Sequence, residues 1–493
     1  MTSSAPTGTD RPIMTGGAYD PVQTETTETR LRVTGAIPEW LDGRYVRNGP
    51  NPIGAVDPAT FHYFMGDGMV HGVRLRGGRA EWYRNRWVRS RDAAKALGEP
   101  MPSSSGVSVA ANTTVIGHAG ATLALVEAGG TCYALTDELE TIGSWTFQGT
   151  LPGGYTAHPK LDQATGELHA ISYRFDHPGF VHYSVFDVRG RARRVVDVPV
   201  SGSPLVHDMG LTQRHVVVLD LPIEFDLPRA MRAVGVPERM IEPGARVAAK
   251  LIGRVPASGR LADLAASRLR NGDMPYSWSP DHPSRLGVLP RGAAGAAVRW
   301  FEIPQCFAFH VLGAYDEVDA DGRPVAVVVD GVRYDEVFAD NDRGPEGSST
   351  RLTRWRLDLG TGRAIETTVD DRQQEFPRID ERLIGRPYRY GYASGLAPDG
   401  TGTVDDRILK HDLVAGSTES HSLGAGTEVG ELVFVPRSPD AAEDDGVLMG
   451  FVHDGVTGAD RLELLDAASL ESVAQVHLPV RVPHGFHGNW LPA

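Results

Sequence analysis

The histidines of this sequence are the residues whose type and surroundings point most directly to chemistry. Four of the 17 stand beside apolar residues at predicted strand ends or turns: His158 (GGYTAHPKLD), His207 (SPLVHDMGLT), His310 (CFAFHVLGAYDE) and His487 (PHGFHGNW). Any one such histidine is more often a hydrogen-bonded core residue than a ligand, and the long intervals between them match no short-spaced metal motif. They form a metal site only if the fold brings distant segments together.

Other catalytic patterns are absent from the sequence. It contains no GxSxG nucleophile turn, no HExxH zinc motif and no GxxxxGK[ST] phosphate loop. These absences argue against a hydrolase, a zinc peptidase and a nucleotide-dependent enzyme. The net charge of −14 repels phosphate backbones, so we expect no nucleic-acid partner.

Cysteine content and the N-terminal residues bear on the compartment. Two cysteines, Cys132 and Cys306, cannot build a disulfide framework, which is typical of a reducing compartment. The first thirty residues lack the apolar core of a signal peptide, and no apolar run approaches the roughly 18 residues that span a bilayer. The sequence therefore predicts a cytoplasmic protein.

A recurring phrase of two alternating runs around a tight polar turn predicts β-hairpins throughout the chain. Five copies occur: Tyr133–Gly143, Leu161–Ser172, Phe186–Val198, Leu357–Val369 and Leu464–Leu478. Repeated hairpins without intervening helices favour an all-β fold, and a β-propeller is our first choice because radial repetition protects strand edges. A large sandwich or barrel is the alternative. A propeller would also bring inner strands of distant blades to one axis, where widely spaced histidines could bind a metal.

One segment, residues 227–269, departs from the strand pattern. It is rich in Ala, Leu, Val and Arg, with apolar residues at helical spacing, and predicts a helical insertion on the β scaffold. Such an insertion is either a cap packed on the body or, since basic residues flank apolar ones, a surface for apolar substrate or a membrane.

At the four histidine phrases the sequence resembles the carotenoid cleavage oxygenases, which include apocarotenoid oxygenases, lignostilbene dioxygenases and a retinoid isomerohydrolase. The resemblance also covers DGRYVRNGPNP (42–52), FHYFMGDGMVHGV (61–73), QEFPRID (374–380), ELVFVPR with AEDDG (431–446) and VPHGFHGNW (482–490). It runs from about Gly35 to the C-terminus. We therefore expect an N-terminal extension over 1–34 and a single propeller domain over 35–493.

The resemblance implies a seven-bladed β-propeller, capped by loops and helices, with one Fe(II) on its axis held by His158, His207, His310 and His487. His484 lies three residues before His487, but the family phrase is FHG, which selects His487. Four neutral imidazoles suit Fe(II) and depart from the 2-His-1-carboxylate arrangement of many non-haem iron oxygenases.

Further residues are assigned by the same resemblance. Glu127, Glu375 and Glu431 would accept the distal N–H of His207, His310 and His487 respectively, which leaves His158 without a carboxylate. Thr113 corresponds to a small β-branched residue whose methyl group partly occludes an open iron position in relatives.

The implied activity is cleavage of one carbon–carbon double bond of a carotenoid or apocarotenoid by O2, giving two carbonyl fragments, with iron and no organic cofactor. The alternatives are a lignostilbene-type dioxygenase, a non-oxidative retinoid-type isomerase and a metal-free binding propeller. Val126 bears on the substrate, because lignostilbene dioxygenases carry a lysine at this place, directly before the glutamate of the LALVE phrase. An apolar side chain there cannot bind a phenolate, which favours an apolar polyene substrate.

Overall fold

Short antiparallel hairpins are the local unit of this fold. The computed structural model describes residues 17–56, 61–100, 110–151, 154–174, 177–252, 274–338, 348–398 and 401–493. Aspartates make the turns: the Asp358 carboxylate accepts the N–H groups of Gly360 and Thr361 at 3.0 and 2.7 Å. Gly362 then takes a positive φ of 76°, which a residue with a side chain rarely adopts. All five hairpins predicted from the sequence are present.

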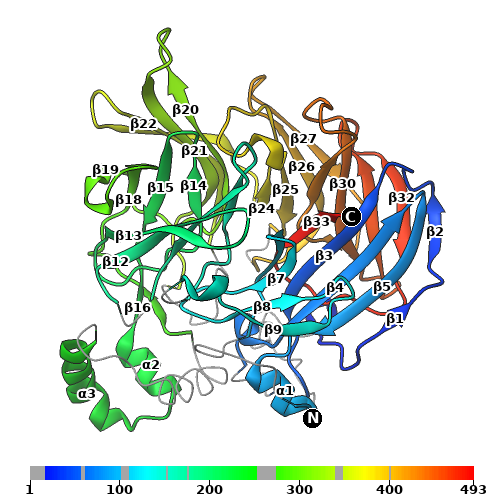
Figure 1. Ribbon diagram of the computed structural model, residues 1–493, viewed down its shortest axis with the longest axis horizontal. Coiled ribbons are helices and arrows are strands. Elements are labelled where there is room, and N and C mark those ends of the chain that lie inside the picture. Colours follow the sequence, from blue (N-terminus) through cyan, green and yellow to red (C-terminus); the bar gives the residue numbers. More distant parts are fainter. Residues whose placement is uncertain are drawn as a thin grey trace, which may run out of the picture.

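Seven antiparallel sheets are built from these hairpins and stand around one axis as the blades of a propeller (Figure 1). In spatial order, blade 1 contains β33 (Gly488–Pro492), β3 (Asp42–Pro50), β4 (Gly68–Arg76), β5 (Arg79–Trp87) and β1 (Thr27–Glu28); blade 2 contains β6 (Thr114–His118), β7 (Ala121–Leu125), β8 (Cys132–Leu135) and β9 (Thr141–Trp145); blade 3 contains β10 (Lys160–Asp162), β11 (Glu167–Ser172), β12 (Phe180–Phe186) and β13 (Ala192–Pro199); blade 4 contains β14 (Met209–Leu211), β15 (His215–Asp220), β18 (Arg285–Pro290) and β19 (Arg299–Glu302).

The remaining blades continue the ring in chain order. Blade 5 contains β20 (Val311–Val318), β21 (Pro324–Tyr334), β22 (Thr350–Asp358) and β23 (Ala364–Asp370); blade 6 contains β24 (Gln374–Arg378), β25 (Tyr390–Leu396), β26 (Val404–Asp412) and β27 (Ser417–Ser422); blade 7 contains β29 (Val433–Pro436) and β28 (Thr427–Val429), both beside β30 (Gly446–Asp454), then β31 (Ala459–Asp466), β32 (Ser472–His477) and β2 (Arg32–Gly35). The seven-bladed propeller expected from the sequence is thus the observed fold.

Both ends of the chain close the ring. The C-terminal strand β33 pairs with β3 in blade 1, and the N-terminal strand β2 pairs with β32 in blade 7. Strand β1 adds to the edge of blade 1 beside β5. The last part of the segment 1–34, which the sequence analysis set apart as an extension, therefore belongs to the propeller, because two blades use its backbone to pair their edge strands.

Apolar side chains fill the spaces between neighbouring blades. Leu123 of blade 2 and Phe186 of blade 3, for example, belong to one buried cluster with Phe147 from the connection between them. Alternation along each strand sends every second residue into such a cluster. The hydrophobic core is thus divided into wedges around the axis, and the axis itself is left to the first strand of each blade.

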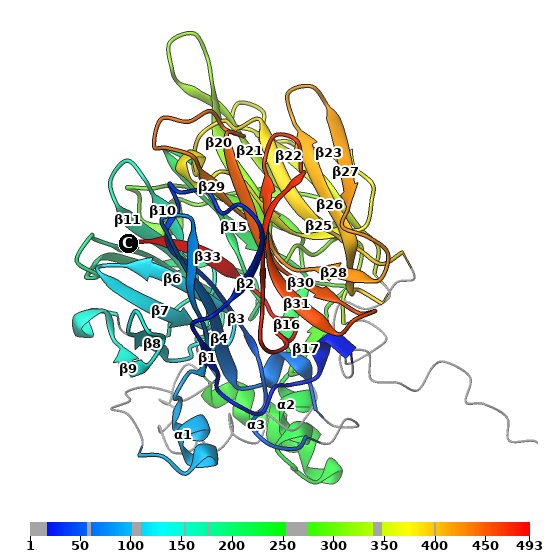
Figure 2. The ribbon, with the colours of Figure 1, turned by 90° about the vertical axis from the view of Figure 1, so that its right-hand side faces the viewer.

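The helices lie together at one end of the sheets in both views (Figures 1 and 2). They are α1 (Arg91–Leu97), α2 (Leu227–Ala233) and α3 (Glu238–Leu251), and a two-stranded ribbon of β16 (Ile223–Phe225) and β17 (Tyr276–Trp278) flanks the last two. The carboxylate of Asp226 caps α2 by accepting the N–H of Arg229 at 2.9 Å. The predicted helical insertion is confirmed over 227–251, while its part from 253 to 269 lies outside the described residues.

Single-turn 3-10 helices join several strands: η1 (Gly17–Tyr19), η2 (Tyr63–Met65), η3 (Phe147–Gly149), η4 (Gly295–Ala297) and η5 (Glu381–Leu383). Within the described part of the chain, no helix has the length and apolar character needed to cross a bilayer.

Candidate metal centre

Each of the four histidines singled out in the sequence stands immediately before the axial strand of a blade. His310 and His487 directly precede β20 and β33, and His158 and His207 stand two residues before β10 and β14. The four histidines form one cluster, so four segments that are distant in sequence meet where these four strands begin. The tertiary fold supplies the proximity that their spacing in the sequence lacks.

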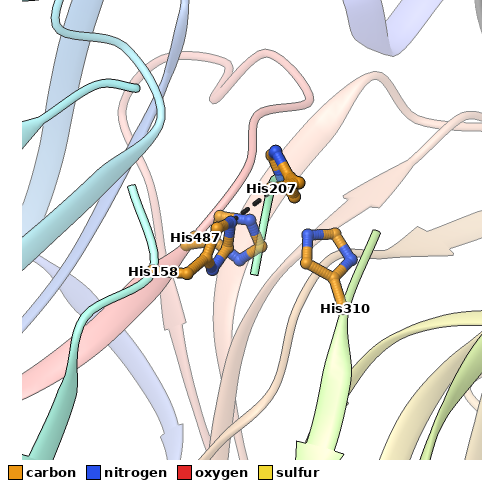
Figure 3. Close-up of side chains that lie close together, drawn as sticks. All are labelled: His158, His207, His310 and His487. Carbon is orange, nitrogen blue, oxygen red and sulfur yellow. Dashed lines mark hydrogen bonds between the residues drawn. The ribbon is translucent and has the colours of Figure 1, made fainter. Parts of the chain in front are cut away.

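The four imidazoles face one another across a small space (Figure 3). One ring nitrogen of each lies within 4.8 Å of those of the others, and the Nε2 atoms of His158 and His207 are 3.0 Å apart. The Nε2 atom of His310 is buried and has no hydrogen-bond partner among the described residues. A buried nitrogen without a partner is costly unless something else binds it, so this donor set fits a metal ion.

Three glutamates hold three of these rings by the other nitrogen. The Nδ1 atom of His207 lies 2.9 Å from Glu127 Oε2, and that of His310 lies 2.5 Å from Glu375 Oε2. The third distance, from His487 Nδ1 to Glu431 Oε1, is 2.9 Å. Each carboxylate thus accepts an Nδ1–H, which leaves the Nε2 lone pair free to bind a metal.

No carboxylate in the described part of the chain bonds to His158, whose backbone N–H instead donates to Thr156 Oγ1 at 3.2 Å. The three histidine–glutamate pairs, and the histidine without one, are those expected from the sequence.

Burial and neighbouring charges set the protonation of the histidines. Burial lowers the pKa of His158 well below its ordinary value, and the other three histidines lower it further. Burial also lowers the pKa of His487 to about 4, against the opposing effect of Glu431. In His207 burial is outweighed by the Glu127 carboxylate, and the pKa is raised. His158 and His487 are therefore neutral at pH 7, the form in which an imidazole can bind a metal.

An arginine that the sequence analysis did not single out bonds to the carboxylate that holds His487. Arg378 Nη1 lies 3.1 Å from Glu431 Oε2, and the backbone N–H of Gly488 donates to the same oxygen at 2.8 Å. Burial would raise the pKa of Glu431, but Arg378 and His487 hold it at about 2. The charge of Glu431 is thus shared between Arg378 and His487.

Aromatic rings pack directly on the histidines. The Phe309 ring stands perpendicular to that of His207, with centroids 5.4 Å apart. The Phe376 ring is stacked on His310, with centroids 5.6 Å apart, and meets the edge of His487. Phe376 has a φ of 54°, a strained conformation for a residue with a side chain, which is typical of functional sites.

A cavity of about 1090 Å³ follows the axis of the propeller. It is lined by three of the four histidines, namely His158, His310 and His487, and by residues of the axial strands β6, β10, β14, β20, β24 and β33. Charged side chains, including Lys160 and Asp208, face it as well as apolar ones.

Comparison with known proteins gives the family. A family model described as retinal pigment epithelial membrane protein matches residues 19–492. A carotenoid cleavage oxygenase of Mycobacterium tuberculosis is 48% identical over 100% of both chains. The chain belongs to the carotenoid cleavage oxygenase family. The carotenoid 9,10(9',10')-cleavage dioxygenase 1 of Phaseolus vulgaris is 30% identical over 96% of this chain and 88% of its own.

Solved structures support the carotenoid cleavage oxygenase fold. The lignostilbene dioxygenase of Pseudomonas brassicacearum superposes with a TM-score of 0.80 at 27% identity, covering 99% of this chain and 100% of its own. A cobalt-substituted apocarotenoid oxygenase of Synechocystis has a TM-score of 0.77 at 23% identity, covering 97% and 98% of the two chains, and shows the fold alone.

Three further residues named from this family resemblance have clear places. The carbonyl of Thr113 accepts the backbone N–H of His487 at 3.1 Å, which puts it beside the histidine cluster. Val126 is half-buried and packs against an apolar cluster of blades 1 and 2. His484, the competing histidine, bonds instead to Glu428 and lies against the Tyr19 ring, outside the cluster of four.

Contacts around the site also involve residues that the sequence reasoning missed. Tyr334 donates its hydroxyl to Glu375 Oε1 at 2.8 Å, and Arg378 and Asp208 bond to groups next to the histidines. Arg378 and Asp208 lie inside the phrases QEFPRID and VHDMGLT, which carry the family resemblance, so the available signal was a charged residue close to a candidate ligand or to its glutamate.

A second grouping of possible ligands, His177, His182 and Asp197, lies on blade 3. The Nδ1 atom of His182 is hydrogen-bonded to Asp197 at 2.8 Å, and the Asp197 side chain is 53% exposed. A solvated pair that already satisfies itself needs no metal, and the four axial histidines remain the candidate metal centre.

Proposed function

We propose that this protein is an Fe(II)-dependent dioxygenase that cleaves one carbon–carbon double bond of a carotenoid or apocarotenoid with O2, giving aldehyde or ketone products. The observation that carries the proposal is the buried cluster of His158, His207, His310 and His487 on the propeller axis, in a chain 48% identical to a carotenoid cleavage oxygenase. Imidazole is a preferred ligand of ferrous iron, and four neutral ligands leave the ion its double positive charge. A ferrous ion held there would supply the redox chemistry that activates O2.

The chain's own residues would orient the ion and keep the site dry. Glu127, Glu375 and Glu431 fix the tautomer and plane of three imidazoles, so that each presents Nε2 inward. The rings of Phe309 and Phe376 exclude water from the side on which they pack. Thr113, beside His487, is proposed to narrow access to one coordination position with its methyl group.

The substrate class is argued from apolar surface and from Val126. A conjugated polyene is recognised by burial of apolar area, worth about 25 cal/mol per Å², and the aromatic rings at the centre provide such area. Val126 offers neither a charge nor a proton acceptor to a phenol. A lignostilbene-type activity is the second candidate, since the lignostilbene dioxygenase structure is similar throughout. It would need another group to bind the phenol, for example the hydroxyl pair of Tyr173 and Tyr276, whose oxygens are 3.0 Å apart.

Location and contact with a membrane belong to the same proposal. Both cysteines are buried and unpaired, which supports a reducing, cytoplasmic compartment. Helix α3 buries Ile241 and Ala245 but leaves Met240 and Val247 54% and 60% exposed. We propose that this exposed apolar face touches a lipid surface peripherally and gives access to an insoluble substrate.

The test combines metal analysis with product analysis. We expect the purified protein to contain one iron, to consume O2 and to release two carbonyl fragments from a carotenoid or an apocarotenal. Isomerised product without O2 consumption would instead identify a non-oxidative isomerase, and cleavage of a hydroxystilbene alone would identify the second candidate.

Variants of neighbouring histidines make the test specific. We expect His487→Ala to lose iron and activity, and the same loss from Ala at His158, His207 or His310. His484→Ala is the matched control, because its imidazole bonds to Glu428 away from the cluster, and it should retain iron. Loss of iron in His484→Ala with retention in His487→Ala would overturn the ligand assignment.

A further inference from the structure

One buried carboxylate beside the histidine cluster has contacts that the proposed function does not use. Asp208 follows His207, and its side chain is 1% exposed. Its oxygens accept three bonds: from Lys160 Nζ at 2.8 Å, from the backbone N–H of Val311 at 2.8 Å and from the backbone N–H of Met209 at 2.7 Å.

Each of these three donors begins a different strand that follows one of the histidines. Lys160 begins β10 two residues after His158, Met209 begins β14 two residues after His207, and Val311 begins β20 directly after His310. A single carboxylate thus connects blades 3, 4 and 5 within one or two residues of three of the four histidines.

The chemistry of these bonds makes the connection stiff. Bonds to an ionised carboxylate are shorter and roughly twice as strong as neutral ones. A buried carboxylate also resists separation from its donors, because losing one would leave an uncompensated charge in the interior. Lys160, with a side chain 19% exposed, supplies the compensating charge from the axial cavity.

We propose that Asp208, together with Lys160, is a positioning device that sets the spacing of His158, His207 and His310 and thereby the affinity and coordination geometry of the metal centre. The glutamates orient the imidazole rings, whereas Asp208 holds the backbone from which the rings project. His487 is outside this device, since Glu431 and Arg378 hold its segment instead. The proposal rests on the metal site proposed above.

The experiment measures binding of Co²⁺ to the full-length protein after removal of bound metal, by its visible absorption. Asp208→Asn keeps the size of the side chain but removes the charge, so we expect affinity to fall 10–100-fold, the range known for outer partners of metal ligands. We also expect its cobalt absorption bands to shift, because the spacing of three ligands changes. A role in folding alone would leave those bands unchanged.

The matched control is Asp316→Asn. Asp316 is also buried and also links blades 4 and 5, through His215 Nδ1 at 2.7 Å and the N–H of Arg214 at 3.0 Å. It lies six residues along β20 from His310, about 20 Å away. The Asp316→Asn variant should have a lower thermal unfolding midpoint but the same Co²⁺ affinity and the same cobalt absorption bands as the unmodified protein.

A second pair covers the case in which Asp208→Asn does not fold. Lys160→Met keeps both backbone bonds to Asp208 but removes its cation, and we expect a smaller loss of affinity than for Asp208→Asn, with partial rescue by Lys160→Arg. Lys410→Met, which removes a buried lysine of blade 6 from its ion pair with Asp444, is the control. Unchanged affinity and bands in both Asp208→Asn and Lys160→Met would overturn the proposal, as would equal changes in the controls. Absence of Co²⁺ binding in the unmodified protein would instead overturn the proposed function.

Discussion

A buried histidine at the base of the helical insertion is predicted to carry a positive charge that stabilises the fold. His282 Nε2 lies 2.8 Å from Asp220 Oδ1, and its Nδ1 lies 3.3 Å from Glu224 Oε1. Burial would lower its pKa, but the two carboxylates raise the pKa to about 9. Asp220 ends β15 and Glu224 belongs to β16, so this ion pair fastens the ribbon that leads into α2 to blade 4.

The size of the effect follows from the difference between folded and unfolded protein. A group whose pKa is 6.5 in the unfolded chain and about 9 in the folded protein stabilises the fold by at most about 3 kcal/mol, since each pKa unit is worth about 1.4 kcal/mol. Because the folded pKa is the higher one, this stabilisation is complete below pH 6.5 and is lost as the pH rises through 9. It should be about 3 kcal/mol at pH 5.5, about 2 kcal/mol at pH 7.5 and close to zero at pH 10.

The assay is urea unfolding of the unmodified protein and of His282→Gln at these three pH values. We expect the difference in unfolding free energy to shrink by about 2 kcal/mol between pH 7.5 and 10. The control is His71→Gln, because His71 is also buried but burial lowers its pKa. The loss of unfolding free energy caused by His71→Gln should therefore be the same at pH 7.5 and pH 10. A difference for His282→Gln that does not change between pH 5.5 and 10 would show that the imidazole is uncharged and refute the reasoning.

Three other predictions concern the metal, the substrate and the membrane. Replacing any of the three glutamates that bond the histidines with Gln should weaken iron binding or turnover 10–100-fold without abolishing it; wild-type metal content and rate in all three would contradict this role. Val126→Lys should raise kcat/KM for a hydroxystilbene relative to an apocarotenal in the same detergent, and a tenfold preference of the unmodified protein for the stilbene would contradict the substrate assignment. Changing Met240 and Val247 to Asp should reduce flotation with neutral liposomes, and equal, negligible flotation of both proteins would leave α3 a structural cap.

Local features of this fold were readable from the sequence because their causes are local. Each predicted hairpin depends on an alternating run and a polar turn. In several of them an aspartate of the turn bonds to backbone N–H groups shortly after it, as Asp466 does with Ala468 and Ser469. The segment around α2 was readable for the same reason, since its cap, Asp226, is adjacent to the helix. The number of blades was not local information, and it came from the family resemblance.

The candidate centre shows where sequence reasoning ends. The phrases around the histidines named the residues, but no spacing rule brings His158 and His310 together, because that depends on how seven blades close around an axis. His484 and His487 are three residues apart, yet the chain turns one imidazole toward Glu428 and the other toward Glu431.

The contacts of Asp208, a residue that would support the metal ligands without binding the metal, were likewise not predictable from the sequence. Its charge and its place after His207 are visible in the sequence, but its bond to the N–H of Val311 is not. A backbone N–H carries no side-chain signature, and only the close approach of two blades at the axis makes it the partner of a carboxylate 103 residues earlier in the chain. The sequence by itself thus determined which residues could bind a metal, and the tertiary structure decided which of them meet and what holds them in place.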